Sequence, residues 1–409
     1  MAAIARADKA FAGLRTIRYN ESARLWRSPI SGMPEASHTP EPLYDSEDEY
    51  RPEPEPEPRP PAWQDGSFRI GIHTSIAGDI TNALDSVRKL GCNALQIFST
   101  SPRMWPRQGS RVLDADAARF RARREELGLG PLVIHCNYLI NMASSEPVMR
   151  ARAIQAFHEE IVRGMALDAD FLVVHPGSAG GGPIEPAIAR IAHGLRQAVR
   201  GLRLAGLQIL IENTSGMGAA VGSRFGEIRA IFDAAPDVPL GCCLDTAHTL
   251  EAGYEIRTAE GLERTLDAIE STVGLTNVAV VHVNDSKTPL GSRVDRHQHI
   301  GRGTIGLDAF ARILTHPRLG PAAPAGLPGR AFILETPIDR SGDDRRNVRV
   351  LWQLAGVARE LVPKAEKDFS MFRSVRPPAE ASRKPAGRAA RSASTRKRRT
   401  ARRKTRRAK

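Results

Sequence analysis

The chain has 409 residues and 41% apolar content, enough for one large domain with a sizeable core or for two ordinary domains. It has no apolar run of about 18 residues, which excludes a membrane-spanning helix, and its N-terminus lacks the continuous apolar segment of a secretory signal. The net charge of +13 belongs to the C-terminal end: residues 376–409 hold fifteen Lys or Arg and one acid, so the rest is nearly neutral.

The two ends of the chain differ in composition from its middle. Residues 34–60 are acidic and include EPEPEPEPRPP, which is typical of an extended polyproline II spacer. The basic tail has too few large apolar residues to offset the entropy of ordering, and its positive charge indicates an arm that binds nucleic acid, with a merely solubilising tail as the alternative. We predict a disordered extension at 1–66, a folded domain at 67–365 and a disordered basic tail at 366–409.

Eight short apolar runs follow one another through the predicted domain. They are continuous rather than alternating, which is typical of parallel strands covered by helices. In chain order they are FRIGIH (68–73), ALQIF (94–98), PLVIH (131–135), FLVVH (171–175), QILIE (208–212), PLGCCLD (239–245), VAVVHV (278–283) and AFILE (331–335).

Amphipathic helices are predicted between these runs, at 80–90, 115–127, 147–167, 184–205 and 259–273. Several are followed by a glycine suited to a left-handed helix stop, namely Gly91, Gly128, Gly206 and Gly274. The eight repeats predict the α/β class and a closed (β/α)8 TIM barrel. A doubly wound open sheet is the alternative, although no GxGxxG or GxxxxGK[ST] loop follows any strand.

Six of the apolar runs end in, or contain near their end, a side chain that can bind metal, and three more such side chains follow in predicted loops. The six are His135, His175, Glu212, Asp245, His282 and Glu335, and the three are His248, Asp295 and His297. Taken singly, each residue would more often have a structural role. In a barrel, however, the C-terminal ends of all strands meet at one mouth, so together they predict a single site.

The residue types in this predicted site indicate divalent metal. Four carboxylates in one mouth cannot all stay ionised without cations. Imidazole and carboxylate donors without thiolate suit zinc, with Mn²⁺ or Fe²⁺ as alternatives, and nine ligands are too many for one ion. The four cysteines form no metal-binding spacing and lie in apolar segments, which favours a reducing intracellular compartment.

At these residues the chain resembles the endonuclease IV family of apurinic/apyrimidinic DNA repair enzymes. The resemblance covers about residues 68–360 and lies in HCNYLIN (135–141), VVHPGS (173–178), IENTSGMG (211–218), LDTAHTLEAGY (244–254), HVNDSKTPLGSRVDRHQHIGRGTIG (282–306) and ILETP (333–337). It implies three zinc ions in a TIM barrel. His135, His175 and Glu212 would hold the first ion; Glu212 would bridge to the second, completed by Asp245, His282 and Glu335; His248, Asp295 and His297 would hold the third.

The resemblance also implies residues that open DNA. Arg103 would enter the duplex, and Tyr138 and Leu139 would form a wedge beside the lesion, whereas Met104 departs from the polar residue common in the family. The implied reaction is zinc-dependent hydrolysis 5′ to abasic sites in double-stranded DNA, with Glu212 catalytic and with trimming of blocked 3′ ends. Mn²⁺ is a possible substitute for zinc. We predict a monomer that is intracellular, associated with DNA and not with membranes.

Two other classes of function fit parts of the sequence. A sugar isomerase or epimerase on a similar barrel would also place His and acids around one or two divalent ions. A non-enzymatic scaffold could bind DNA through the basic tail alone. The isomerase or epimerase class leaves the Asp295-x-His297 module and the wedge residues unexplained, whereas deletion of the tail would distinguish the scaffold from the enzyme. His73 is predicted to lie just outside the metal ligands, and His299 ranks below His297 as a ligand.

Overall fold

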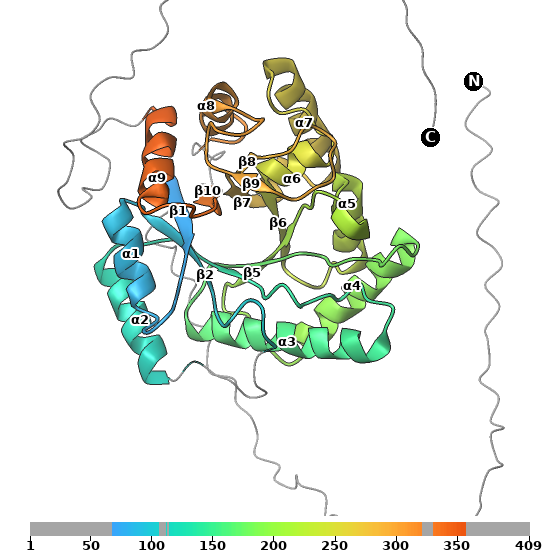
Figure 1. Ribbon diagram of the computed structural model, residues 1–409. Coiled ribbons are helices and arrows are strands. Elements are labelled where there is room, and N and C mark those ends of the chain that lie inside the picture. The colour runs from blue at the N-terminus through green and yellow to red at the C-terminus, as the bar shows by residue number, and fades with distance from the viewer. Residues whose placement is uncertain (1–67, 106–111, 113, 321–329, 357–409) are drawn as a thin grey trace, which may run out of the picture. The chain divides into compact units, whose positions relative to one another are not determined.

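The computed structural model describes residues 68–105, 112, 114–320 and 330–356 of the chain. Both predicted terminal extensions lie outside these residues. Within the described part, eight parallel strands close into a barrel in the order β1-β10-β7-β6-β5-β4-β3-β2, and helices surround it (Figure 1). The predicted TIM barrel is therefore confirmed.

Each of the eight predicted runs forms one barrel strand. The strands are β1 (Arg69–Thr74), β2 (Ala94–Phe98), β3 (Leu132–His135), β4 (Phe171–Val174), β5 (Gln208–Glu212), β6 (Leu240–Asp245), β7 (Val278–His282) and β10 (Ala331–Leu334). The first and last strands close the barrel, with Ile70 of β1 paired to Phe332 of β10. A separate antiparallel hairpin consists of β8 (Asp285–Ser286) and β9 (His297–Gln298).

The helices in the described part of the chain are α1 (Asn82–Leu90), α2 (Asp114–Glu126), α3 (Pro147–Ala166), α4 (Ile184–Val199), α5 (Phe225–Ala234), α6 (Thr246–Glu251), α7 (Ala259–Thr272), α8 (Leu307–Thr315) and α9 (Asp343–Leu354), with short 3-10 helices η1 (Met217–Ala219) and η2 (Leu275–Asn277). None of the described helices has the length and apolar character needed to cross a bilayer. Large buried side chains such as Phe120, Phe157 and Phe310 belong to the larger apolar core, to which both helices and strands contribute.

One predicted helix is shorter than expected. The sequence pattern extended it from 184 to 205, but α4 ends at Val199, and Gly201 follows in the left-handed region with φ of 75°. Gly201 rather than Gly206 therefore lies at the helix end, because a glycine adopts this conformation without the steric cost that a side chain adds. The other four predicted helices begin and end within two residues of α1, α2, α3 and α7.

A second, smaller apolar core fills the inside of the barrel. It consists of Ala94, Val133, Phe171, Val173, Leu210, Cys243, Val280, Ala331 and Ile333. Because side chains alternate across a strand, the residue two positions beyond an interior residue also points inward, one layer closer to the C-terminal mouth. That next layer is polar in all eight strands and consists of His73, Gln96, His135, His175, Glu212, Asp245, His282 and Glu335.

Gly71 allows β1 to pair closely within this barrel. A Cβ atom at this position would lie 2.6 Å from the backbone carbonyl carbon and oxygen of Ala94 on β2, and 2.6 Å from Cδ1 of Ile333 on β10. Such contacts are far inside van der Waals separation. The glycine therefore fits β1 between its two neighbours, and β1 carries His73 into the polar layer.

We predict that Gly71→Ala destabilises the protein by at least about 2 kcal/mol, because the added methyl group meets backbone that cannot move aside. Chemical denaturation of the purified variant measures this change. Gly226→Ala on α5 is the matched control, since nothing lies within 4 Å of its added Cβ, and it should be neutral or stabilise slightly. Equal effects of the two substitutions would contradict the close approach of β1.

Candidate active site

The structure brings together all nine predicted metal ligands at the C-terminal mouth of the barrel. They fall into overlapping groups in which one donor atom from each residue lies within 4.8 Å of the others. The groups are His135, His175 and Glu212; Glu212, Asp245, His282 and Glu335; Asp245, His248 and His297; and His248, Glu251 and Asp295. Only Glu251 was not selected from the sequence.

Glu212 lies at the centre of the cluster and is fully buried. Its Oε2 is 3.1 Å from Nε2 of His135 and 3.4 Å from Nε2 of His175, and its Oε1 is 3.0 Å from Nδ1 of His282. Burial by itself would raise the pKa of Glu212, but the nearby His175 and His282 lower this pKa well below its usual value. Glu212 is therefore held as a carboxylate.

Backbone carbonyls set the orientation of several of these imidazole rings. Nδ1 of His135 lies 2.8 Å from the carbonyl oxygen of Cys136, Nδ1 of His248 lies 2.9 Å from that of Asn213, and Nδ1 of His297 lies 3.3 Å from that of Glu335. Each Nδ1 must donate to its carbonyl, so in the neutral ring Nε2 keeps a free lone pair. These lone pairs point toward carboxylate oxygens, and Nε2 of His297 is buried without a hydrogen-bond partner in the described part of the chain.

This arrangement fits divalent cations. A lone pair on nitrogen and a carboxylate oxygen repel each other at 3.0–3.7 Å unless a cation or a proton lies between them. Ligands about 2.0–2.2 Å from one tetrahedral ion lie about 3.3 Å from each other, which matches these separations. The four cysteines are buried and belong to none of the groups, so the donors are nitrogen and oxygen only.

Protons take the place of cations when no metal is bound. Burial lowers the pKa of His282, but Glu335 and Glu212 outweigh burial and raise this pKa to about 9. For His248, too, burial lowers the pKa, yet Asp245 and Asp295 raise it well above its usual value. The metal-free site thus holds extra protons at neutral pH, and metal binding would release them.

Gln96 belongs to none of the donor groups but contacts two of the candidate ligands. Its fully buried amide oxygen lies 2.8 Å from Nε2 of His282, and its Nε2 donates to Oε1 of Glu335 at 2.5 Å. The amide therefore keeps the proton of neutral His282 on Nε2 and leaves Nδ1 free to face the cluster. His73 lies where it was predicted, with Nδ1 3.4 Å from Oε1 of Glu335. Gln96 was missed, although a polar residue inside the apolar run ALQIF is a usable signal.

The third set of candidate ligands lies outside the barrel strands. His248 was predicted in a loop, but it lies on α6, because Asp245 caps the helix by accepting from the backbone N–H of His248 at 2.8 Å. His297 was also predicted in a loop and lies on β9. Oδ2 of Asp295 is 3.3 Å from Nε2 of His248; burial raises the pKa of Asp295, but His248 outweighs it and the pKa is lowered to about 2.

His299 faces away from the cluster, in agreement with its lower rank as a ligand. Its Nε2 lies 3.2 Å from Oδ2 of Asp339, and its Nδ1 lies 3.1 Å from Nδ2 of Asn347. Both ring nitrogens are therefore occupied by residues that belong to none of the donor groups.

The predicted DNA-contact residues lie on two loops that are joined to each other. Nδ2 of Asn137 donates to the carbonyl oxygens of Ser101 at 2.8 Å and Met104 at 2.7 Å, and the N–H of Tyr138 donates to Pro102 at 3.2 Å. Tyr138 is 60% exposed, and its ring lies 6.0 Å from that of His135. Arg103 and Met104 are exposed and Leu139 is half-buried. Tyr138 therefore lies beside the donor cluster.

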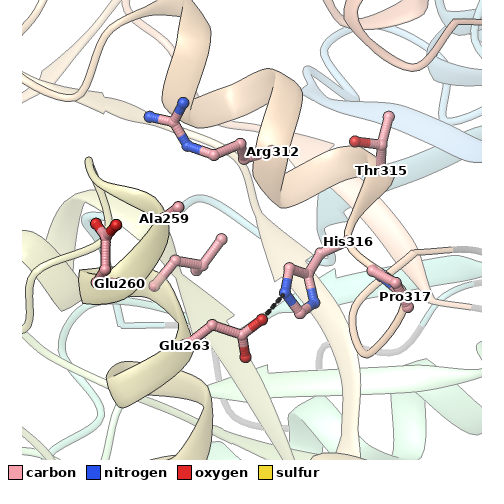
Figure 2. A pocket seen from close by; sticks show the side chains of 8 residues that line it. Ala259, Glu260, Glu263, Arg312, Thr315, His316 and Pro317 are labelled. Carbon is pink, nitrogen blue, oxygen red and sulfur yellow. Dashed lines mark hydrogen bonds and ion pairs between the residues drawn. The ribbon is translucent and has the colours of Figure 1, made fainter.

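A surface pocket between α7 and α8 contains none of these residues. Figure 2 shows its lining, in which Glu263 bonds to Nε2 of His316 at 3.0 Å. Glu263 also pairs with Arg318. The Glu263 carboxylate is thus shared between His316, which lines the pocket, and Arg318.

Comparison with known proteins agrees with the geometry. A family described as "Xylose isomerase-like TIM barrel" matches residues 84–352. "Probable endonuclease 4" of Solibacter usitatus is 50% identical over 292 residues, which cover 70% of this chain and 97% of that protein. The chain belongs to the endonuclease IV family. It is therefore a phosphodiester hydrolase of the AP endonuclease type, as predicted from the sequence.

Solved structures extend the comparison. The crystal structure of endonuclease IV from Thermus thermophilus has a TM-score of 0.61 and 38% identity, and covers 71% of this chain and all of that one. A D-tagatose 3-epimerase-like protein has a TM-score of 0.53 at 16% identity, and covers 72% of this chain and 99% of that one. The second likeness shows a shared fold alone, so the alternative of a sugar isomerase or epimerase gains no support from it.

We predict that Gln96→Met lowers the affinity of the site for divalent metal by about 10- to 100-fold, because His282 and Glu335 lose the amide that orients them. Competition with a chromophoric chelator measures the affinity. Gln208→Met is the matched control, since the Gln208 amide, among the described residues, bonds to the carbonyl of Leu240 at the opposite end of the barrel. Unchanged metal affinity in Gln96→Met would show that the amide does not position these two side chains.

Proposed function

We propose that this member of the endonuclease IV family is a DNA repair enzyme that hydrolyses the phosphodiester bond 5′ to abasic sites in duplex DNA. The products would be a 3′-hydroxyl and a 5′-deoxyribose phosphate, and the same chemistry would trim blocked 3′ ends. Three zinc ions per chain would be held by the nine gathered side chains. The protein would act as a monomer on DNA inside the cell, without membrane association.

The observation that carries this proposal is the set of imidazole nitrogens that face carboxylate oxygens across the barrel mouth. Bound divalent ions would offset the negative charge of the four carboxylates, attract a phosphodiester and lower the pKa of water enough for attack at neutral pH. Zinc is proposed because the donors are imidazole and carboxylate without thiolate. Mn²⁺ would be an alternative occupant.

Glu212 would orient the attacking water and accept its proton. It is buried at the centre of the cluster, and both of its oxygens lie within 3.1 Å of an imidazole nitrogen. Its lowered pKa keeps it ionised, so its oxygens can accept hydrogen bonds from the attacking water. The imidazoles around it hold the carboxylate in one orientation.

The two joined loops would open the duplex at the lesion. Tyr138 and Leu139 would fill the gap beside an unstacked nucleotide, and Arg103 would enter the vacated stack. A nucleotide without a base costs little to extrude, and a mouth too narrow for a base would reject normal nucleotides. The exposed Met104 adds an apolar side chain to the same loop as Arg103.

We expect Glu212→Gln to lower the rate of incision of an abasic duplex by at least about 100-fold, because an amide cannot accept the proton of the attacking water. Gel analysis of end-labelled duplex measures the rate. Binding of the same duplex should persist, since the DNA-opening loops are unchanged. Incision at a near-normal rate would remove Glu212 from the proposed role.

Metal removal tests the cofactor separately. A chelator should abolish incision by the unaltered protein, and added zinc should restore it, while elemental analysis should find three zinc ions per chain. A purified protein that contains one or two Mn²⁺ ions and does not incise abasic duplex would favour a sugar isomerase or epimerase instead.

The basic tail, residues 376–409, is proposed to add affinity for DNA of any sequence. Its removal should weaken binding to duplex DNA by at least about 10-fold near 0.1 M salt and make binding less dependent on salt, because fewer counterions are released. Incision should persist at low salt. Complete loss of incision at low salt would show that the tail is part of the catalytic machinery rather than an accessory.

A further inference from the structure

Glu251, which is not one of the nine predicted ligands, lies beside the third set of candidate ligands. It occupies the last position of α6 and is fully buried. One of its carboxylate oxygens lies within 4.8 Å of donor atoms on both His248 and Asp295. The resemblance to the family assigned no role to this position.

The two oxygens of Glu251 have different environments. Oε1 accepts hydrogen bonds from Oγ of Ser286 at 2.6 Å, from Oγ1 of Thr288 at 3.2 Å and from the N–H of Arg296 at 3.3 Å. Oε2 is buried and has no hydrogen-bond partner among the residues that the structure describes. A buried carboxylate oxygen without a partner is costly, and a cation would offset that cost.

The hydrogen bonds of Oε1 also connect two segments that carry candidate ligands. Ser286, Thr288 and Arg296 belong to the segment that runs from β8 to β9 and contains Asp295, whereas Glu251 and His248 belong to α6. The backbone adds to this connection, because the carbonyl oxygen of Glu251 accepts from the N–H of Arg293 at 3.0 Å. Glu251 is thus held in one place relative to both His248 and Asp295.

We propose that Glu251 is an additional ligand of the third metal ion and binds it through Oε2. The inference rests on the proposed function, because it assumes that His248, Asp295 and His297 hold this ion. The hydrogen bonds to Oε1 would fix the carboxylate, and Oε2 would provide the oxygen donor. The third ion would then have one more protein carboxylate than the resemblance implies.

The substitution Glu251→Gln tests the proposal. The amide oxygen can still accept from Ser286, Thr288 and Arg296, but an amide nitrogen replaces Oε2 and cannot bind a cation. We expect the variant to fold with unchanged thermal stability in the metal-free form and to bind one of its three zinc ions at least about 10-fold more weakly. Metal titration against a chromophoric chelator and the visible spectrum of the cobalt-substituted protein give this result without measuring activity.

Two further variants identify the ion and exclude an indirect effect. If Glu251 and Asp295 bind the same ion, Glu251→Gln combined with Asp295→Asn should lose no more zinc than Asp295→Asn alone. Thr288→Val is the matched control, because it removes one donor to Oε1 and leaves Oε2 unchanged; its zinc affinity should equal that of the unaltered protein. Equal weakening in Thr288→Val and Glu251→Gln would overturn the proposal in favour of a purely structural connection.

The failure of this inference is distinct from failure of the proposed function. Suppose that the unaltered protein binds three zinc ions and that Glu251→Gln binds each of them as tightly as the unaltered protein does. Glu251 is then not a ligand, and the proposed function stands. If the unaltered protein binds fewer than three ions, the proposed function itself is wrong, and the assignment of Glu251 fails with it.

Discussion

The site depends on imidazole nitrogens and carboxylate oxygens that face each other in a buried mouth and need a proton or a cation between them. Backbone carbonyls occupy Nδ1 of His135, His248 and His297, so these rings cannot turn the other nitrogen toward the acids without losing a hydrogen bond. The protein thereby keeps the donors close together. Protons hold His248 and His282 beside the acids when no metal is bound, and divalent cations would replace these protons.

The barrel positions these side chains because its eight strands pair with one another in a closed ring. Seven strands place an apolar residue inside the barrel two positions before the polar residue, and β1 places Gly71 there, so the polar layer lies directly on a packed apolar layer. Gly71 lets β1 approach Ala94 and Ile333 closely enough to complete the ring. The side chains of the site therefore start from backbone positions that the packing beneath them determines.

The strands and most of the candidate site could be predicted, because a continuous apolar run that ends in His, Asp or Glu is a local pattern. Residues that depend on long-range contacts could not be predicted this way. His248 is a different case, because the cap that places it on a helix is local: Asp245, three residues earlier, accepts from its backbone N–H. Gln96 and Glu251 acquire their roles only from partners far away in the chain, such as Glu335 and Ser286. The early end of α4 at Val199 was missed because the amphipathic pattern continues beyond it.

Closure of the barrel by β1 and β10 has a consequence for how the enzyme matures. The donor groups draw on strands from β3 to β10, and Glu335 follows the last of them, 200 residues after His135. During synthesis, a nascent chain that has not yet released β10 from the ribosome lacks Glu335 and the strand that holds β1 against β7. Glu335 can consequently join the other candidate ligands only after the chain has been translated beyond β10.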